Sequence, residues 1–245
     1  MTEELAYTPG VADRNVLIEK ALLLPITATA GTVSASVKPN RPSLADMQLH
    51  YPATNVSRDF LYNGKIKGEF IGQEKTKYLQ NTCATRMSYA LLKSGFALSK
   101  TADQDSSMRG ADGKWYWIRL NELRDELVKR FKGFDAELKF DPIPKEATEW
   151  HPKFLEVCAA RKAKGQQFIN TQLAGKSGII VFKVAGWELA SGHFTMWDGK
   201  KKELAFATTH GDPSNMHYYF WFTYMGDLGL GPIEYVTHIG FWELK

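Results

Sequence analysis

Two side chains in this sequence could act together as a nucleophile and a base, those of Cys83 and His193. Cys83 stands at the expected start of a helix. Unpaired backbone N–H groups and the positive end of the helix dipole favour the thiolate there, which is the nucleophilic form. The same N–H groups can stabilise an oxyanion. A nearby histidine must then accept and return the proton.

His193 has the most suitable surroundings of the six histidines, because it follows Gly192 in an expected strand that ends in a tight turn. Gly192 would let a substrate backbone approach, and we count Ser191 with it as substrate-binding. Cys83 and His193 are 193 − 83 = 110 residues apart, so only tertiary structure can join them. The competing interpretation is structural, since a lone cysteine on an apolar helix face usually serves packing.

Helical periodicity accounts for the position of the cysteine. Apolar or small residues at 83, 87, 90 and 91 share one face of a helix expected over residues 81–92. Asn81 or Thr82 can cap its start, and Ser94 with Gly95 ends it. A second amphipathic helix is expected over residues 120–131. Both helices precede the sheet in the chain.

The second half of the sequence predicts an antiparallel sheet, so the fold class is α+β. The expected strands span residues 178–184, 192–197, 203–209, 220–224 and 235–244. The aromatic run 217–224 could line a groove, although a buried strand is the favoured interpretation. Residues 1–40 are expected to form an arm or linker before a domain at 41–245. An insertion at about 134–175 would contain a helix near 152–164.

Composition excludes several classes of protein. The chain has 245 residues, 44% of them hydrophobic and 24% charged, with a net charge of +4, which is typical of a globular protein without the dense basic stripe of a nucleic-acid binder. No apolar run is long enough for a membrane span. Two cysteines and no histidine pair at ligand spacing predict neither a metal site nor a cofactor. Glu3 and Glu4 disfavour a secretory leader, so any export is expected to use no cleavable signal.

A family resemblance rests on several short motifs. The segment NTCATRMSYAL at residues 81–91 resembles the cysteine motif of the family 4 amidase effectors of type VI secretion, which are papain-like enzymes related to the NlpC/P60 peptidases. The segment SGHFTMWDG at 191–199 resembles the histidine motif. Segments 110–116, 178–187 and 241–244 resemble the parts between and after them. The similarity covers roughly residues 41–133 and 175–245.

The resemblance implies a papain-like, NlpC/P60-type fold, with the cysteine on the helical half and the histidine on the sheet. It also implies hydrolysis of peptidoglycan stem peptides at the bond between the γ-carboxyl of D-glutamate and meso-diaminopimelate. Cys83 would be the nucleophile and His193 the general base. Asn81 and the Cys83 amide would hold the oxyanion. By its position just before the histidine motif, Trp187 is equally a candidate for a substrate groove and for core packing.

The third catalytic residue is where this sequence departs from the family pattern. The family orients the imidazole with an aspartate shortly after the histidine hairpin, and no aspartate stands at that place here. Glu203 is the nearest acid, and Asp212 is the next candidate. Asp198 is expected to serve only the turn. A cysteine pair that the family has near this hairpin is also absent.

The expected partners follow from the same resemblance. They are a peptidoglycan peptide as substrate, the secretion apparatus, and a cognate immunity protein, while no nucleic acid or membrane span is expected. The protein would act in the periplasm or cell wall of a target bacterium. The missing aspartate leaves two alternatives open: a non-catalytic cell-wall binding module, and a cysteine peptidase or acyltransferase with a substrate outside the cell wall.

Overall fold

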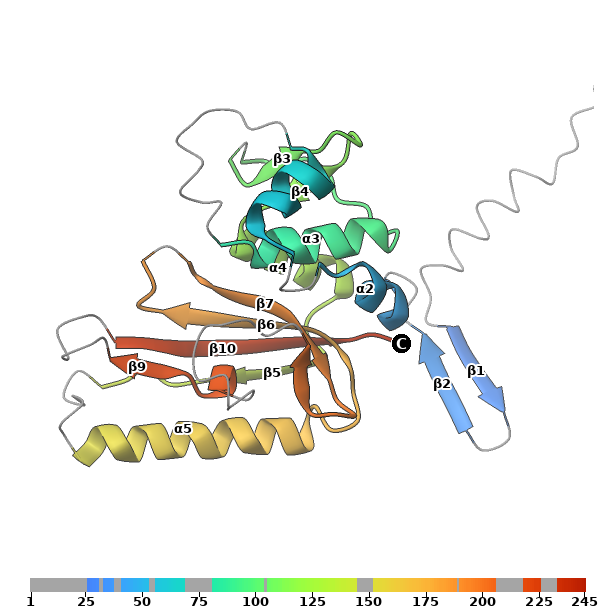
Figure 1. Ribbon diagram of the computed structural model, residues 1–245. Helices are drawn as coiled ribbons and strands as arrows, with labels where there is room; N and C mark the ends of the chain where they lie inside the picture. Colours follow the sequence, from blue (N-terminus) through green and yellow to red (C-terminus); the bar gives the residue numbers. More distant parts are fainter. Residues whose placement is uncertain are drawn as a thin grey trace, which may run out of the picture.

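A computed structural model describes the parts of the chain from which the site is built (Figure 1). The described residues are 26–30, 33–37, 41–52, 56–68, 81–103, 105–144, 152–188, 190–205, 218–225 and 233–245. No helix in these segments is both long and apolar enough to cross a bilayer.

An antiparallel sheet of six strands forms the middle layer of the molecule. Its order is β5-β10-β6-β7-β8, and β9 also pairs with β10. The strands are β5 (Ala136–Lys139), β6 (Gly178–Ala185), β7 (Gly192–Asp198), β8 (Glu203–Ala205), β9 (Thr223–Met225) and β10 (Ile233–Glu243). Because β8 pairs only with residues 196–198 of β7, the first half of β7 has no strand partner on that side within the described part of the chain.

Each face of the sheet is covered by helices, so alternate side chains along the strands enter two different cores. Ile179 and Val181 pack with the helices that precede the sheet in the chain. Ile180 and Phe182 alternate with these two residues along β6, and they pack with the helix on the opposite face. The continuous apolar sequence of β6 is what burial on both faces requires.

The helical layer above the sheet in Figure 1 carries the candidate nucleophile. It consists of α2 (Leu44–His50), a π-helical segment η1 (Phe60–Ile66), α3 (Cys83–Lys93) and α4 (Leu120–Phe131), with a hairpin of β3 (Ser107–Arg109) and β4 (Trp115–Trp117). Met87, Ala90 and Leu91 of α3 are fully buried. This is the apolar face that the sequence predicts.

The opposite layer is α5 (Pro152–Thr171), which lies beneath the sheet with the short turn η3 (Tyr218–Phe220) beside it (Figure 1). Arg161 of α5 is 4% exposed. It donates hydrogen bonds to the carbonyl oxygens of Val236 and Asp141 and to the Thr223 hydroxyl. One buried guanidinium therefore joins α5 to β9, β10 and the chain that precedes the helix.

The beginning and end of the main domain meet at one corner. The amide of Leu44 donates to the carbonyl of Lys245 at 2.8 Å. Arg41 forms a part-buried ion pair with Asp135 and donates to the carbonyl of Glu243. Before this corner, β1 (Ile26–Ala30) and β2 (Val33–Val37) form an antiparallel hairpin.

The α+β class and the order of helices before sheet are confirmed. The expected arm at 1–40 contains the hairpin β1–β2, and the stretch 134–175 supplies β5 and α5. The helix expected near 152–164 runs to Thr171. The expected strand 220–224 is replaced by η3 followed by β9, whereas the Asp198–Gly199 turn forms as predicted. Residues 206–209 of the expected third strand lie outside the described residues.

Candidate active site

Cys83 is the first residue of α3 and lies against the start of β7. Its Sγ atom is 3.9 Å from the carbonyl oxygen of Gly192, the residue before His193. The cysteine is 5% exposed. The fold therefore brings the thiol to the start of the histidine strand, although 110 residues separate the two in sequence.

Burial dominates the acidity of this thiol. Desolvation raises the pKa of Cys83 to about 11, against the lowering effects of the backbone amides of Phe194, Ala84 and Cys83 and of the Arg86 charge. At neutral pH the resting side chain is therefore a protonated thiol that donates weakly to the Gly192 carbonyl. The same amides would stabilise the anion once a base removes the proton.

His193 lies on β7 directly opposite Phe182 of β6. Its ring stacks on Tyr219 with centroids 5.0 Å apart and an interplanar angle of 16°. Tyr219 belongs to the core on the α5 side of the sheet, while Cys83 belongs to the core on the α3 side. The Cys83 side chain thus lies with the core on one face of the sheet, and the His193 ring packs on a residue of the core on the other face.

Gly192 is required by the close approach of β6 and β7. Its φ is +153°, and a Cβ atom at this position would lie 1.9 Å from the carbonyl oxygen of Phe182. No side chain can be accommodated there without displacing one of the strands. This steric reason adds to the one suggested by the sequence, in which the glycine gives a substrate access.

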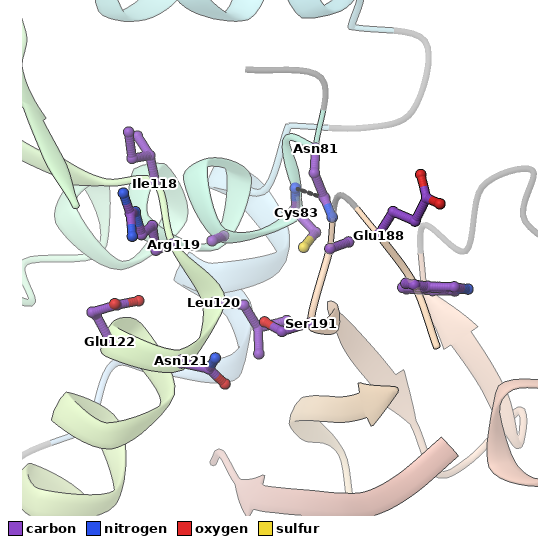
Figure 2. A pocket seen from close by; sticks show the side chains of 12 residues that line it. Asn81, Cys83, Ile118, Arg119, Leu120, Asn121, Glu122, Glu188 and Ser191 are labelled. Atoms are coloured by element: carbon purple, nitrogen blue, oxygen red, sulfur yellow. Dashed lines mark hydrogen bonds between the residues drawn. The ribbon is translucent and has the colours of Figure 1, made fainter. Parts of the chain in front are cut away.

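Asn81 contacts Cys83 in a way that modifies the expected oxyanion site. Its Oδ1 accepts from the Cys83 amide at 3.3 Å, drawn as the dashed line in Figure 2. The amide of Cys83 is therefore already engaged. The Asn81 side-chain NH₂ group, which this bond orients, is a further donor for an oxyanion beside the other amides at the start of α3.

A cavity of about 350 Å³ opens beside the thiol (Figure 2). The start of α3, the start of α4 and the β6–β7 connection all contribute to its wall. The lining residues are Asn81, Cys83, Ala84, Ile118, Arg119, Leu120, Asn121, Glu122, Trp187, Glu188, Ala190 and Ser191. Four of the site residues expected from the sequence are among them, namely Asn81, Cys83, Trp187 and Ser191.

Trp187 is held in place as part of the cavity wall. Its Nε1 donates to Glu234 Oε2 of β10 at 2.9 Å, and its ring packs edge-on against Phe222. Gly186, the residue before it, has a φ of +90° and lies too close to the Ile233 carbonyl for a side chain. The indole is thereby fixed at the rim of the cavity.

Glu203 and Asp212, the two candidates for the third catalytic residue, differ in what the structure shows of them. Glu203 pairs with Asp198, which is five residues along β7 from His193. At about 3.3 Å per residue this separation is about 16 Å, so the structure does not bring Glu203 to the imidazole, and that expectation needs correction. Asp212 lies outside the described residues, as does His217 at the start of the aromatic run. Asp198 accepts from the amides of Lys200 and Lys201, as expected of a turn residue.

Sequence reasoning missed the cavity wall formed by α4. Arg119 and Glu122 bring a positive and a negative group to the cavity, and Glu188 brings a second carboxylate from the β6–β7 connection. No local motif marks these residues, because only the packing of α4 beside α3 places them near the thiol. Within the described residues, no cluster of three metal-binding side chains occurs.

The sequence of this chain matches the model of one protein family. The model of the type VI secretion system amidase effector protein 4, Tae4, matches residues 79–242, which include the whole of α3, the cavity and β7. The chain belongs to the Tae4 family of amidase effectors. It is therefore a hydrolase of the cysteine type, an antibacterial effector that degrades peptidoglycan.

Solved structures of Tae4 proteins share the fold. The Tae4–Tai4 effector–immunity complex from Salmonella Typhimurium is 25% identical, with a TM-score of 0.52 over 84% of this chain and 99% of that chain. The complex from Enterobacter cloacae is 22% identical, with a TM-score of 0.51 over the same shares. No curated protein sequence matches this chain.

Proposed function

We propose that this Tae4 protein cleaves the bond between the γ-carboxyl of D-glutamate and meso-diaminopimelate, with Cys83 as nucleophile and His193 as general base. The observation that carries this proposal is the contact between the Cys83 sulfur and Gly192 beside an open cavity. It supports a site in which the thiol can meet a substrate carbonyl next to the strand that carries His193.

The chemistry would proceed in two acyl-transfer steps. His193 takes the proton from the thiol as sulfur attacks the carbonyl carbon, and the resulting oxyanion accepts hydrogen bonds from the Asn81 NH₂ group and the start of α3. Collapse breaks the C–N bond, and His193 gives its proton to the leaving amine. Water then attacks the thioester, gives a proton to His193, and releases the glutamyl carboxylate as the thiol is restored.

Asp212 is the acid that we propose as the orienting partner of His193. It follows the histidine hairpin in the sequence, as the family aspartate does, and Glu203 is too far along the sheet. A carboxylate on the far ring nitrogen would fix the tautomer that accepts a proton from sulfur. Replacing Asp212 by Asn is expected to reduce kcat more than it changes KM.

Two further proposals concern partners and place of action. The Salmonella and Enterobacter relatives were solved with an immunity protein, Tai4, and we propose that a cognate immunity protein closes the cavity of this chain. We also propose that the type VI apparatus delivers the protein to the periplasm of a target cell. Its substrate lies there.

Digestion of purified sacculi tests the proposed reaction. Wild-type protein should release muropeptides with a new diaminopimelate amine, and Cys83→Ala should release none. Cys158→Ala is the matched control, since Cys158 lies on α5 on the opposite side of the sheet. Equal products from wild type and Cys83→Ala would refute the proposal. Sacculus binding without new amines, unchanged in Cys83→Ala, would instead indicate a cell-wall binding module.

A further inference from the structure

The first turn of α3 is held by Arg86, which lies three residues after the thiol and does not line the cavity. Its Nε donates to Thr82 Oγ1 at 2.8 Å. Its two terminal nitrogens donate to the carbonyl oxygens of Pro52 at 3.2 Å and Val56 at 2.6 Å. One guanidinium thus joins the residue before Cys83 to the segment between α2 and η1.

The bond to Thr82 also affects the start of the helix. Thr82 occupies the N-cap position, where a threonine hydroxyl ordinarily accepts from a backbone N–H of the first turn. Here no side-chain cap forms, and the hydroxyl oxygen accepts from Arg86 instead. The N–H groups of the first turn are therefore not covered by the Thr82 side chain at the end of the helix that carries the nucleophile.

We propose that Arg86 is a positioning residue for Cys83. Arg86 fixes the first turn of α3 and places a positive charge near the thiol. This proposal rests on the proposed role of Cys83 as nucleophile. Arg86 acts through Cys83 and makes no contact with substrate.

Titratable groups near the thiol come from several elements. Tyr51 follows α2, Tyr62 belongs to η1 and Arg86 to α3, while His193 follows the contacted Gly192 on β7. Across the cavity, Arg119 and Glu122 at the start of α4 and Glu188 after β6 add three further charged groups. Burial raises the pKa of both tyrosines, so they stay neutral near pH 7. The Arg86 charge favours the Cys83 thiolate. A change at Arg86 should therefore alter the pH profile of the thiol as well as its position.

The test compares Arg86→Met and Arg86→Lys in a chain that also carries Cys158→Ala, so that Cys83 is the single cysteine. Two readouts are needed: the rate of iodoacetamide alkylation against pH, and kcat and KM on a soluble disaccharide tetrapeptide. Lys93→Met is the matched control, because Lys93 is a cation at the far end of α3 that pairs with Asp112.

Arg86→Met should shift the alkylation profile to higher pH and lower kcat about 100-fold with little change in KM, since a displacement of about 1 Å at a nucleophile has this effect. Arg86→Lys should keep the alkylation profile, because it keeps the charge. Its kcat should fall about 10-fold, because an ammonium group cannot make the three hydrogen bonds of the planar guanidinium. Lys93→Met should match wild type in both readouts.

The proposal is overturned if folded Arg86→Met keeps the wild-type alkylation profile and kcat. If Arg86→Met does not fold, Arg86→Lys decides, and wild-type kcat in that variant overturns the positioning role. Alkylation does not depend on the natural substrate. A failure of the proposed function, seen as full activity of Cys83→Ala, is therefore distinguishable from a failure of the Arg86 proposal.

Discussion

At the scale of single residues, the site is organised around a thiol that the fold keeps protonated. Cys83 is buried at a helix start, and two effects oppose each other there. Desolvation raises its pKa, while the amides of the first turn and the Arg86 guanidinium lower it. Desolvation has the larger effect. In the proposed reaction, Cys83 must therefore be activated by a base.

The raised pKa predicts a loss of stability in alkaline solution. The unfolded thiol ionises near pH 9 and the folded one near pH 11, so the folded state holds the proton more tightly. The contribution of Cys83 is fully present below pH 9 and falls as pH rises towards 11, by about 2 kcal/mol. Urea unfolding at pH 8, 9, 10 and 11 should show a steeper decline for wild type than for Cys83→Ala. Parallel declines would contradict this assignment.

The sequence was sufficient to nominate the nucleophile and the histidine strand, because both depend on local signals. A helix start marks Cys83, and a glycine with a tight turn marks His193. Arg86, Arg119 and Glu122 could not be found in this way. Arg86 is near Cys83 along the same helix, but its bonds to Pro52 and Val56 depend on tertiary structure, as does the position of Arg119 and Glu122 beside the thiol.

At the scale of elements, Gly192 allows β7 to approach β6. Gly192→Ala should destabilise the protein by about 3 kcal/mol or more, because its Cβ would overlap the Phe182 carbonyl. It should also reduce activity by displacing the strand that touches Cys83. Gly175→Ala is the control, with a φ of +69° but open space, and should cost only about 1–2 kcal/mol. Equal losses of stability in the two variants would contradict the steric argument.

The attachment of α5 depends on Arg161. Arg161→Met should lower the free energy of unfolding by about 1–3 kcal/mol, because it leaves buried acceptors on β10 and the preceding chain unpaired. Lys162→Met removes the neighbouring exposed cation and should change stability by less than about 0.5 kcal/mol. Chemical denaturation measures both. A small effect of Arg161→Met would mean that apolar contacts alone hold the helix.

Sequence patterns predicted the strongly periodic elements best. The helix expected over 120–131 is α4, and the strand expected at 178–184 differs from β6 by one residue. The role of residues 134–175 was harder to anticipate. β5 has only four residues and becomes a strand through pairing with β10, a contact between segments about 100 residues apart. Local propensity carries no information about such a pairing.

At the scale of the whole molecule, the described contacts of the main domain begin at Arg41. A chain lacking residues 1–40 should keep the thermal stability and sacculus hydrolysis of the full chain. A chain lacking residues 1–43 should lose about 3–5 kcal/mol, since Asp135 would keep a part-buried charge without its arginine. It would also lose Ser43, whose hydroxyl caps α2. Equal stability of the two shortened chains would contradict the importance of this corner.

The backbone hydrogen bond from Leu44 to Lys245 makes the main domain almost a closed ring. A short peptide could join the two ends of that domain, and new ends could be opened in the exposed turn at Lys200–Lys202. A circularly permuted protein of this kind should fold, since nearby termini are what permit such rearrangement. The order in which the elements follow one another along the chain would then not be essential for folding. The contact between the start of α3 and β7 would still have to form.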